Sequence, residues 1–152
     1  MILKRILLID DSPRDTEMVV DALERENIAN AIETLHDGAE ALDYLYCRGA
    51  FAGRTSGNPA LILLDLKMPK VDGMEVLRQI KYDPALRTIP VVMMTSSREE
   101  RDVLTSYELG VNAYVVKPVD FAQFIAAVTQ LGAFWVVWNE PPPLPALIPE
   151  QG

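Results

Sequence analysis

The chain has 152 residues, of which 49% are hydrophobic and 24% charged, a size that fits one compact domain and a short appendage but no second full domain. Against 14 Lys and Arg stand 22 Asp and Glu, and the formal net charge of -8 has the wrong sign for holding nucleic acid or anionic lipid by counterion release. One cysteine, Cys47, and one histidine, His36, exclude an intrachain disulfide and a Cys/His zinc cluster. Catalysis, if present, must use carboxylates, lysine or hydroxyls.

Neither terminus carries a pattern that directs export or membrane insertion. The first apolar run, residues 6–9, stops at Asp10 and is far too short for the core of a signal peptide. The apolar stretch at residues 133–138 is less than half of the roughly 20 residues that a membrane span needs. We therefore expect a soluble cytoplasmic protein that binds neither nucleic acid nor a membrane.

Short apolar runs alternate along the chain with segments of helical period, which is typical of a parallel sheet covered by helices on both faces. The unbroken apolar runs predict strands buried on both faces, at residues 6–9, 31–35, 61–64, 91–94 and 113–116. The helical segments are residues 13–26, 38–46, 73–82, 98–109 and 121–131. The sequence therefore predicts a doubly wound α/β fold.

Capping signals and apolar stripes define the ends and the inward faces of these helices. Ser12 followed by Pro13 begins the first helix, Asp37 and Asp120 precede the second and fifth, and Gly110 ends the fourth. We expect the apolar stripes to face the sheet, and these are Met18, Val19, Ala22 and Leu23 in the first helix, Met74, Leu77 and Ile80 in the third, Val103, Leu104 and Tyr107 in the fourth, and Phe121, Phe124, Ile125 and Val128 in the fifth.

Two segments depart from the strand and helix alternation. Residues 48–59 form a glycine-rich connection longer than usual, either a family-specific insertion or a contact surface. After Gly132 the composition changes to an apolar, proline-rich end, so we divide the chain into a domain of residues 1–132 and an extension of residues 133–152. Phe134, Trp135 and Trp138 in this extension either fold over their own domain or, as we favour for aromatics rimmed by prolines, form an interface.

Polar side chains directly follow four of the predicted strands. Ligands of an open parallel sheet bind beyond the carboxyl ends of its strands, so these residues are the candidates for chemistry. They provide carboxylates, hydroxyls and one ammonium at a single edge of the sheet, namely Asp10 and Asp11 after the first strand, Asp65 after the third, Thr95 and Ser96 after the fourth, and Lys117 after the fifth.

This set of side chains favours phosphoryl transfer with Mg²⁺. Three clustered carboxylates repel one another unless a cation lies among them, and Mg²⁺ prefers oxygen ligands, whereas zinc lacks the nitrogen and sulfur donors it favours. A lysine and a hydroxyl beside the metal suit the charge on a transferring phosphoryl group. Asp65, at the end of a central apolar run, is the natural nucleophile, because a carboxylate can form an acyl phosphate. Asp10 and Asp11, adjacent on one turn, are better placed to share the metal.

Each of these residues taken alone also has a simpler interpretation. The segment from Asp10 to Pro13 is typical of a helix N-terminus. Thr95 could cap the fourth helix, and Tyr114 could pack in its strand without any further role. His36 has no partner for metal or nucleophilic work, and we interpret Cys47 as a small buried residue. The position of Asp65 and Lys117 at the ends of apolar runs nevertheless favours one shared site.

Four fragments, in order and at matching spacing, resemble the receiver domain of two-component response regulators of the chemotaxis-regulator type. They are Leu8-Ile9-Asp10-Asp11-Ser12, Leu63-Leu64-Asp65-Leu66-Lys67-Met68-Pro69 followed by Asp72-Gly73, Met94-Thr95-Ser96, and Tyr114-Val115-Val116-Lys117-Pro118. The resemblance covers residues 5–131. It implies a flavodoxin-like fold of five βα units with the strand order 2-1-3-4-5.

The resemblance also implies a role for each site residue. Asp65 is the phosphoacceptor, and Mg²⁺ is held by Asp11, Asp65 and the backbone carbonyl of Lys67, with Asp10 acting through water. Thr95 and Lys117 contact the phosphoryl oxygens, and Tyr114 swings inward when Thr95 moves. The bond between Lys117 and Pro118 is cis in such relatives. Because relatives often carry Asn, Arg or Met where this chain has Lys67, the lifetime of the phosphoryl group stays open.

The expected function is that of a single-domain response regulator, phosphorylated on Asp65 by a histidine kinase and signalling through changed protein contacts. It would catalyse its own phosphorylation and dephosphorylation without being an enzyme for other substrates. Two alternatives stay open, a phosphohydrolase or phosphotransferase with an aspartyl-phosphate intermediate and a scaffold that needs no phosphorylation. The first usually carries a second aspartate two residues after the nucleophile, where this chain has Lys67.

The long connection and the aromatic extension resemble a narrower group within this family. These are small response regulators that partner bacterial phytochrome kinases, in which a C-terminal extension takes part in dimerisation. The resemblance implies a homodimer and a kinase of the phytochrome type.

Overall fold

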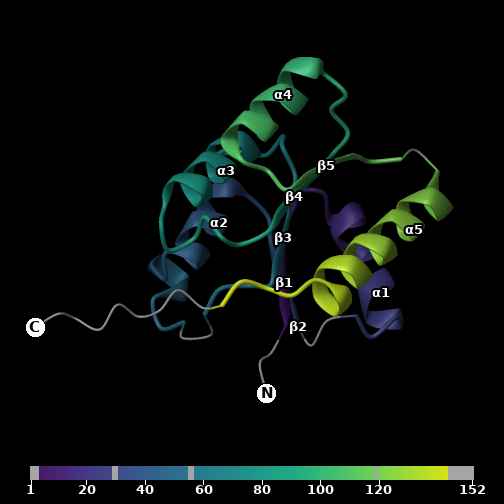
Figure 1. Cartoon of the computed structure of the whole chain (residues 1–152), viewed down its shortest axis with the longest axis horizontal. Helices are drawn as coiled ribbons and strands as arrows, with labels where there is room; N and C mark the ends of the chain where they lie inside the picture. The colour runs from purple at the N-terminus through teal and green to yellow at the C-terminus, as the bar shows by residue number, and fades with distance from the viewer. Residues whose placement is uncertain (1–3, 29–30, 55–56, 119, 144–152) are drawn as a thin grey trace, which may run out of the picture.

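The computed structural model describes residues 4–28, 31–54, 57–118 and 120–143, and these residues form a parallel sheet in the order β2-β1-β3-β4-β5 (Figure 1). The strands are β1 (Arg5–Ile9), β2 (Ala31–Leu35), β3 (Leu61–Leu64), β4 (Val91–Thr95) and β5 (Ala113–Val116). Ile9 at the end of β1 lies beside Leu35 of β2 and Leu64 of β3, so the carboxyl ends of the strands meet at one edge. The predicted doubly wound fold and its strand order are confirmed.

Helices cover both faces of the sheet. They are α1 (Pro13–Arg25), α2 (Gly38–Leu45), α3 (Gly73–Tyr82), α4 (Glu100–Leu109) and α5 (Phe121–Gly132). In Figure 1, α1 and α5 lie on one side of the sheet and α2, α3 and α4 on the other. Each side buries its own apolar cluster, one around Leu7, Ile62 and Leu77 and the other around Leu8, Leu63 and Val128.

The predicted capping residues hold the helix ends. The side chains of Ser12, Asp37 and Asp120 accept hydrogen bonds from the backbone N–H three residues further on, at 3.2, 2.8 and 2.9 Å. Gly110 ends α4 in the left-handed region, at φ 103°, which a residue without a Cβ adopts at little cost. These short-range signals explain why the expected helix bounds are accurate to one or two residues.

Burial in the edge strands and in α4 differs from the expectation. Only the three central strands are almost fully buried, whereas β2 and β5 are half-buried along most of their length, because they lie at the edges of the sheet. In α4 the exposed fractions of Leu104 and Tyr107 are 62% and 51%. The buried residue on this helix is the polar Ser106, whose hydroxyl donates to the carbonyl of Asp102 at 2.7 Å, while Val103 is half-buried.

The long connection packs against the end of α2. It contains the short helix η1 (Gly49–Phe51), and the Phe51 ring meets the Tyr44 ring edge-on, with centroids 5.2 Å apart. Arg54 lies 4.1 Å above the same ring and donates to the Tyr44 carbonyl at 2.9 Å. Cys47, expected to be buried, is exposed, because it lies past the last turn of α2 with φ 53°.

The extension begins as a continuation of α5, the π-helix η2 (Ala133–Trp138). Val136 is only 2% exposed and belongs to the cluster beneath α1 and α5, and its carbonyl accepts a hydrogen bond from Lys4 Nζ at 2.7 Å. Trp135 is half-buried on this cluster, but Phe134 and Trp138 are 53% and 78% exposed. The extension thus both folds onto its domain and leaves an apolar surface; its residues 144–152 lie outside the described part.

Among the described residues, no helix is long and apolar enough to span a lipid bilayer.

Candidate functional site

Three carboxylates gather at the carboxyl edge of the sheet. One oxygen from each of Asp10, Asp11 and Asp65 lies within 4.8 Å of the others. Asp10 and Asp65 are buried, at 3% and 8% exposed, whereas Asp11 is exposed. The structure therefore brings together the three acids that the sequence marks as following β1 and β3.

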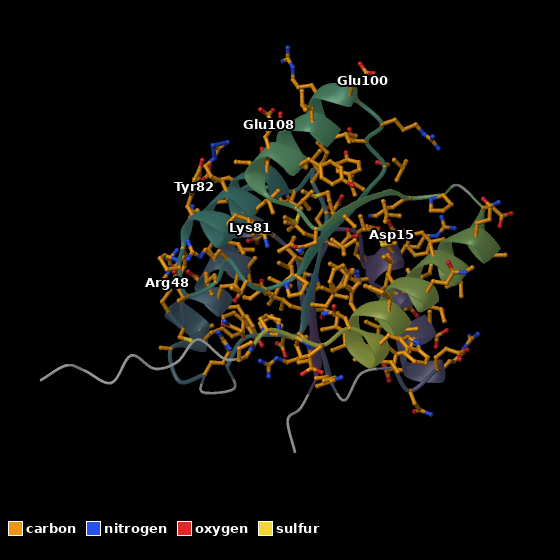
Figure 2. All side chains as sticks on the ribbon, in the orientation of Figure 1. Asp15, Arg48, Lys81, Tyr82, Glu100 and Glu108 are labelled. Carbon is orange, nitrogen blue, oxygen red and sulfur yellow. The ribbon has the colours of Figure 1, made fainter. Side chains whose placement is uncertain are left out.

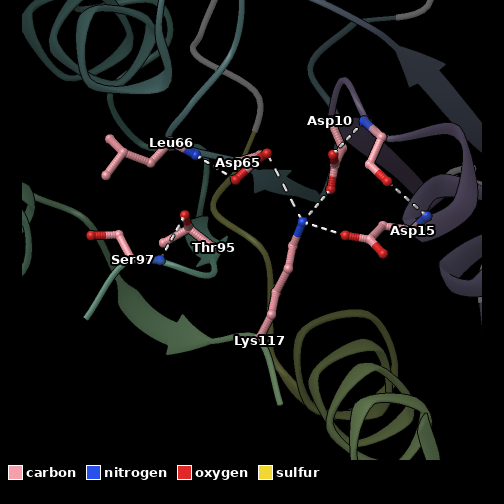
Figure 3. Close-up of polar contacts among 8 residues, drawn as sticks. Asp10, Asp15, Asp65, Leu66, Thr95, Ser97 and Lys117 are labelled. Carbon is pink, nitrogen blue, oxygen red and sulfur yellow. Dashed lines mark hydrogen bonds and ion pairs between the residues drawn. The ribbon is translucent and has the colours of Figure 1, made fainter. Parts of the chain in front are cut away.

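Backbone hydrogen bonds orient both buried acids (Figure 3). Asp10 follows β1 directly, and its Oδ1 accepts from the backbone N–H of Ser12 at 2.9 Å. Asp65 follows β3, where its N–H donates to the Ile9 carbonyl at 2.9 Å and its Oδ1 accepts from the N–H of Leu66 at 2.9 Å. Each carboxylate thus keeps Oδ2 for other partners.

The loop after Asp65 is held by a close approach of two backbone segments. The N–H of Gly73, the first residue of α3, donates to the Leu66 carbonyl at 2.8 Å. A Cβ at Gly73 would lie 2.1 Å from the carbonyl oxygen of Asp65. Only glycine permits this approach, and it fixes the position of the Asp65 backbone relative to α3.

Lys117, the residue after β5, points its ammonium into the cluster. Its Nζ lies 2.8 Å from Asp10 Oδ2, 2.8 Å from Asp15 Oδ2 and 3.9 Å from Asp65 Oδ2, and only 11% of its side chain is exposed (Figure 3). The peptide bond between Lys117 and Pro118, expected to be cis, is trans in the structure. Trans is the lower-energy form for a residue before proline, and in it Lys117 already reaches the acids.

Asp15 is a site residue that the sequence interpretation missed. From the sequence alone it is one acid in the first turn of α1, where negative charge is generally favourable. In Figure 2 it lies near the end of the sheet, where β5 passes into α5. Its position in the sequence could have indicated this role, because it lies three residues after the cap Ser12, on a helix that begins at the carboxyl edge of the sheet.

The electrostatics of the site are those of an excess of negative charge around one cation. Burial raises the pKa of Asp65 to about 6, an effect that the Lys117 charge opposes and the Asp10 charge reinforces. Burial disfavours the charged form of Lys117, but its hydrogen bonds with Asp10 and Asp15 outweigh this and raise its pKa. The all-oxygen donor set fits a hard divalent cation.

Thr95 and Tyr114 connect the site to α4. Thr95 is fully buried at the end of β4, its hydroxyl lowers the pKa of Asp65, and its Oγ1 accepts from the N–H of Ser97 at 3.3 Å. The hydroxyl of Tyr114 donates to the Ser97 carbonyl at 3.0 Å. Thr95 does not cap α4, because the residue at that position is Glu99.

Lys67, two residues after Asp65, has a side chain that is 68% exposed. Its Nζ lies 3.9 Å from Asp102 Oδ2 of α4, and the hydroxyl of Ser97 donates to the same oxygen at 2.6 Å. The Lys67 side chain therefore leans towards α4. His36 is exposed at the end of β2, and no hydrogen bond or ion pair of its side chain is recorded in the described part.

The chain belongs to the response regulator receiver family, because its residues 6–129 match the response regulator receiver domain. It is 41% identical over 133 residues to the response regulator Rcp1 of Synechocystis, covering 88% of this chain and 89% of that protein. The Mn²⁺-bound structure of Rcp1 covers 91% of this chain and 99% of its own, with a TM-score of 0.86 and 40% identity.

Two further similar structures belong to regulators associated with phytochromes. The bacteriophytochrome response regulator RtBRR is 61% identical, with a TM-score of 0.74, over 93% of this chain and 85% of its own. The phosphorylated cyanobacterial phytochrome response regulator RcpA is 38% identical, with a TM-score of 0.87, over 92% of this chain and 99% of its own. The resemblance to phytochrome-associated response regulators is thereby confirmed.

Proposed function

We propose that this receiver accepts a phosphoryl group on Asp65 from a histidine kinase, and that it signals through changed protein contacts. The observation that carries the proposal is the placement of the Asp65 carboxylate, buried between the Asp10–Asp11 pair and the Lys117 ammonium. A carboxylate held this way can act as a nucleophile towards phosphorus, and the cation lowers the repulsion that an incoming phosphoryl group would meet.

The transfer is an in-line displacement. Oδ2 of Asp65 attacks the phosphorus of the donor phosphohistidine, the new P–O bond forms as the P–N bond breaks, and the electron pair stays with the imidazole nitrogen. Lys117 and Thr95 would contact oxygens of the phosphoryl group. Water attacking the same phosphorus later returns the carboxylate and releases inorganic phosphate.

The proposal includes Mg²⁺ at the acidic cluster. The carboxylates of Asp11 and Asp65 and the backbone carbonyl of Lys67 would hold the ion, with Asp10 acting through water, and the Mn²⁺-bound form of Rcp1 supports a divalent cation in a relative. When bound, Mg²⁺ supplies positive charge that offsets the negative charge gathering on the phosphoryl oxygens.

Phosphorylation is proposed to act on α4 through Thr95. A phosphoryl oxygen that accepts from the Thr95 hydroxyl would draw Thr95 towards Asp65 and away from Ser97. The N–H of Ser97 donates to Thr95 Oγ1, and its carbonyl accepts from the hydroxyl of Tyr114. A rearrangement of this segment releases Tyr114 to turn inward and changes the surface that α4 presents. The phosphoryl group shifts the population only as far as it binds one conformation better than the other.

The partners that we propose are a cytoplasmic kinase of the phytochrome type and a second copy of this chain. The phytochrome-associated structures similar to the chain support the first. The exposed Phe134 and Trp138 of the extension support the second, because exposed aromatics of this kind are enriched at interfaces.

We propose no turnover of other phosphate esters. An aspartyl-phosphate phosphohydrolase would need a general acid near the leaving group, and Lys67, at that position in the chain, leans towards Asp102 instead. Steady release of phosphate from a phosphomonoester would contradict this part of the proposal.

Phosphorylation can be tested with Mg²⁺ and a small acyl phosphate such as acetyl phosphate. In the wild-type protein we expect an acid-stable, alkali-labile adduct of one phosphoryl group, measured by intact mass. The control variant Asp21→Asn, which changes an exposed acid on α1, should form the same adduct. Asp65→Asn should give no adduct. An adduct that survives Asp65→Asn, or no adduct in the wild type, would overturn the assignment.

A further inference from the structure

The ammonium of Lys117 is bound by a carboxylate outside the proposed metal and acceptor set. Of its two short contacts, 2.8 Å each, one is to Asp10 and the other to Asp15, whereas Asp65 lies 3.9 Å away. The pair between Lys117 and Asp15 joins the end of β5 to the first turn of α1. Asp15 is 27% exposed in its side chain, and the pair borders a cavity of about 250 Å³.

The cap of α1 explains why Asp15 is available for this contact. An acid three residues after a Ser cap often turns back to accept the backbone N–H of the cap residue. Here that N–H already donates to Asp10 Oδ1 at 2.9 Å, while the Ser12 hydroxyl accepts from the Asp15 N–H at 3.2 Å. The Asp15 carboxylate is thus left to reach Lys117.

We propose that Asp15 is a positioning residue that holds the Lys117 ammonium away from Asp65 before phosphorylation and competes with the phosphoryl group for it. This inference rests on the proposed function of Asp65. A phosphoryl group on Asp65 brings new negative oxygens to the side of Lys117 opposite Asp15, so the ammonium must loosen its bond to Asp15 to contact them. Asp15 therefore opposes phosphorylation, and its removal favours it.

The existence of the pair in solution can be tested by thermal unfolding of Asp15→Asn, Lys117→Met and the double variant. We expect Asp15→Asn to lower the midpoint in the wild-type background and to have little effect when Lys117 is absent. Asp21→Asn, an exposed acid six residues further along α1, should act alike in both backgrounds. Equal effects of Asp15→Asn in the two backgrounds would overturn the pairing.

The competition can be tested by the rate of phosphorylation by acetyl phosphate with Mg²⁺. We expect Asp15→Asn to raise the rate about two- to fivefold, the size expected for loss of one partly exposed charge pair. Asp15→Glu, which keeps the charge, should move the rate less, and Asp21→Asn should leave it unchanged. In the Lys117→Met background Asp15→Asn should have no effect.

The outcomes separate the inference from the function on which it rests. An unchanged or lower rate in Asp15→Asn, with normal phosphorylation of the wild type, would overturn the competition alone. The same increase in the Lys117→Met background would also overturn the competition. The effect would then come from the negative charge of Asp15 itself and not from its pairing with Lys117. If the wild type forms no adduct, the proposed function is overturned, and so is the proposed competition. The unfolding experiment would still show whether Asp15 and Lys117 form an ion pair.

Discussion

At the scale of single residues, the site is defined by two buried acids, Asp10 and Asp65, beside the exposed Asp11. Asp65 is 8% exposed, and burial raises its pKa to about 6 against an ordinary value of 3.8. Because this shift favours the protonated form, the ionised carboxylate costs stability in the folded protein without a metal. The charge that makes Asp65 a nucleophile is therefore held at the expense of folding free energy, as is common at functional sites.

A pH-dependent gain in stability is expected for Asp65→Asn in metal-free buffer. A native pKa above the unfolded value means that the folded state binds more protons between pH 4 and 6, so the contribution of Asp65 to stability falls as pH rises through this window. The raised pKa of Asp65 limits the gain in unfolding free energy to about 3 kcal/mol at most. Because the site is partly solvated, we expect a gain of about 1–2 kcal/mol at pH 7.5. Urea unfolding should show the gain at pH 7.5 and little of it near pH 4.

The matched variant Asp21→Asn removes an exposed charge and should not show this pattern. A gain in Asp65→Asn that is equal at both pH values would contradict the prediction.

Mg²⁺ should stabilise the folded protein through the same carboxylates. An ion that binds only the folded state adds about 2.7 kcal/mol when its concentration is 100 times its dissociation constant. We expect the thermal midpoint of the wild type to rise with Mg²⁺ and that of Asp11→Asn to stay nearly constant. Asp11 is exposed, so its replacement should change little without metal. A full Mg²⁺ response in Asp11→Asn would show that this acid is not a ligand.

At the scale of elements, the helices that follow the strands decide where the site residues lie. The first residue of α3, Gly73, packs against the backbone of Asp65, and Asp102 of α4 accepts the hydroxyl of Ser97, which precedes this helix. Because Ser106 is the buried position of α4, Leu104 and Tyr107 lie outward. The elements thus position the site through backbone contacts and polar pairs as much as through apolar packing.

Gly73→Ala should damage both stability and phosphorylation. A Cβ 2.1 Å from the Asp65 carbonyl forces the acceptor loop away from α3, with an expected loss of about 1–3 kcal/mol, typical of overpacking. We expect a lower thermal midpoint and slower phosphorylation by acetyl phosphate. Gly53→Ala is the matched control, because a Cβ there would have no neighbour within 4 Å. A neutral result for Gly73→Ala would contradict the close approach.

At the scale of the whole molecule, the extension belongs to the α1 and α5 side of the sheet. Val136 completes the apolar cluster there, while Phe134, Val137 and Trp138 project from the same short helix into solvent, where a second copy is proposed to bind. Removing residues 133–152 as a whole would therefore mix loss of core packing with loss of the proposed interface. Point substitutions separate the two effects.

Self-association is expected to depend on the exposed side chains of η2. Phe134→Ser with Trp138→Ser should shift the mass distribution in analytical ultracentrifugation towards the monomer. At a protein concentration where the wild type is also monomeric, the double variant should leave the unfolding midpoint nearly unchanged. Val136→Ala should instead lower stability by about 1–3 kcal/mol, because it empties buried space.

Tyr82, 75% exposed at the outer end of α3 (Figure 2), provides the matched control, and Tyr82→Ser should not change association. An unchanged distribution in the double variant would count against the extension as the dimer interface.

The secondary structure was predictable because its signals are local. Apolar runs, caps such as Asp37 and the stop at Gly110 act within a few residues, and their predicted positions agree with the structure to within one or two residues. The strand order came from the resemblance to receivers, and the observed sheet confirms it. The orientation of α4 was mispredicted, because apolar spacing could not reveal that Ser106 and Asp102 form hydrogen bonds on the inward side.

The sequence by itself determined which side chains end the strands, and in a parallel sheet those ends must meet at one edge. This is why Asp10, Asp65, Thr95 and Lys117 could be assigned to one site from their positions in the chain. Only the tertiary structure decided that Asp15 joins them and that Val136 is buried while Trp138 is exposed. These outcomes depend on distances between side chains far apart in the chain, which local patterns do not encode.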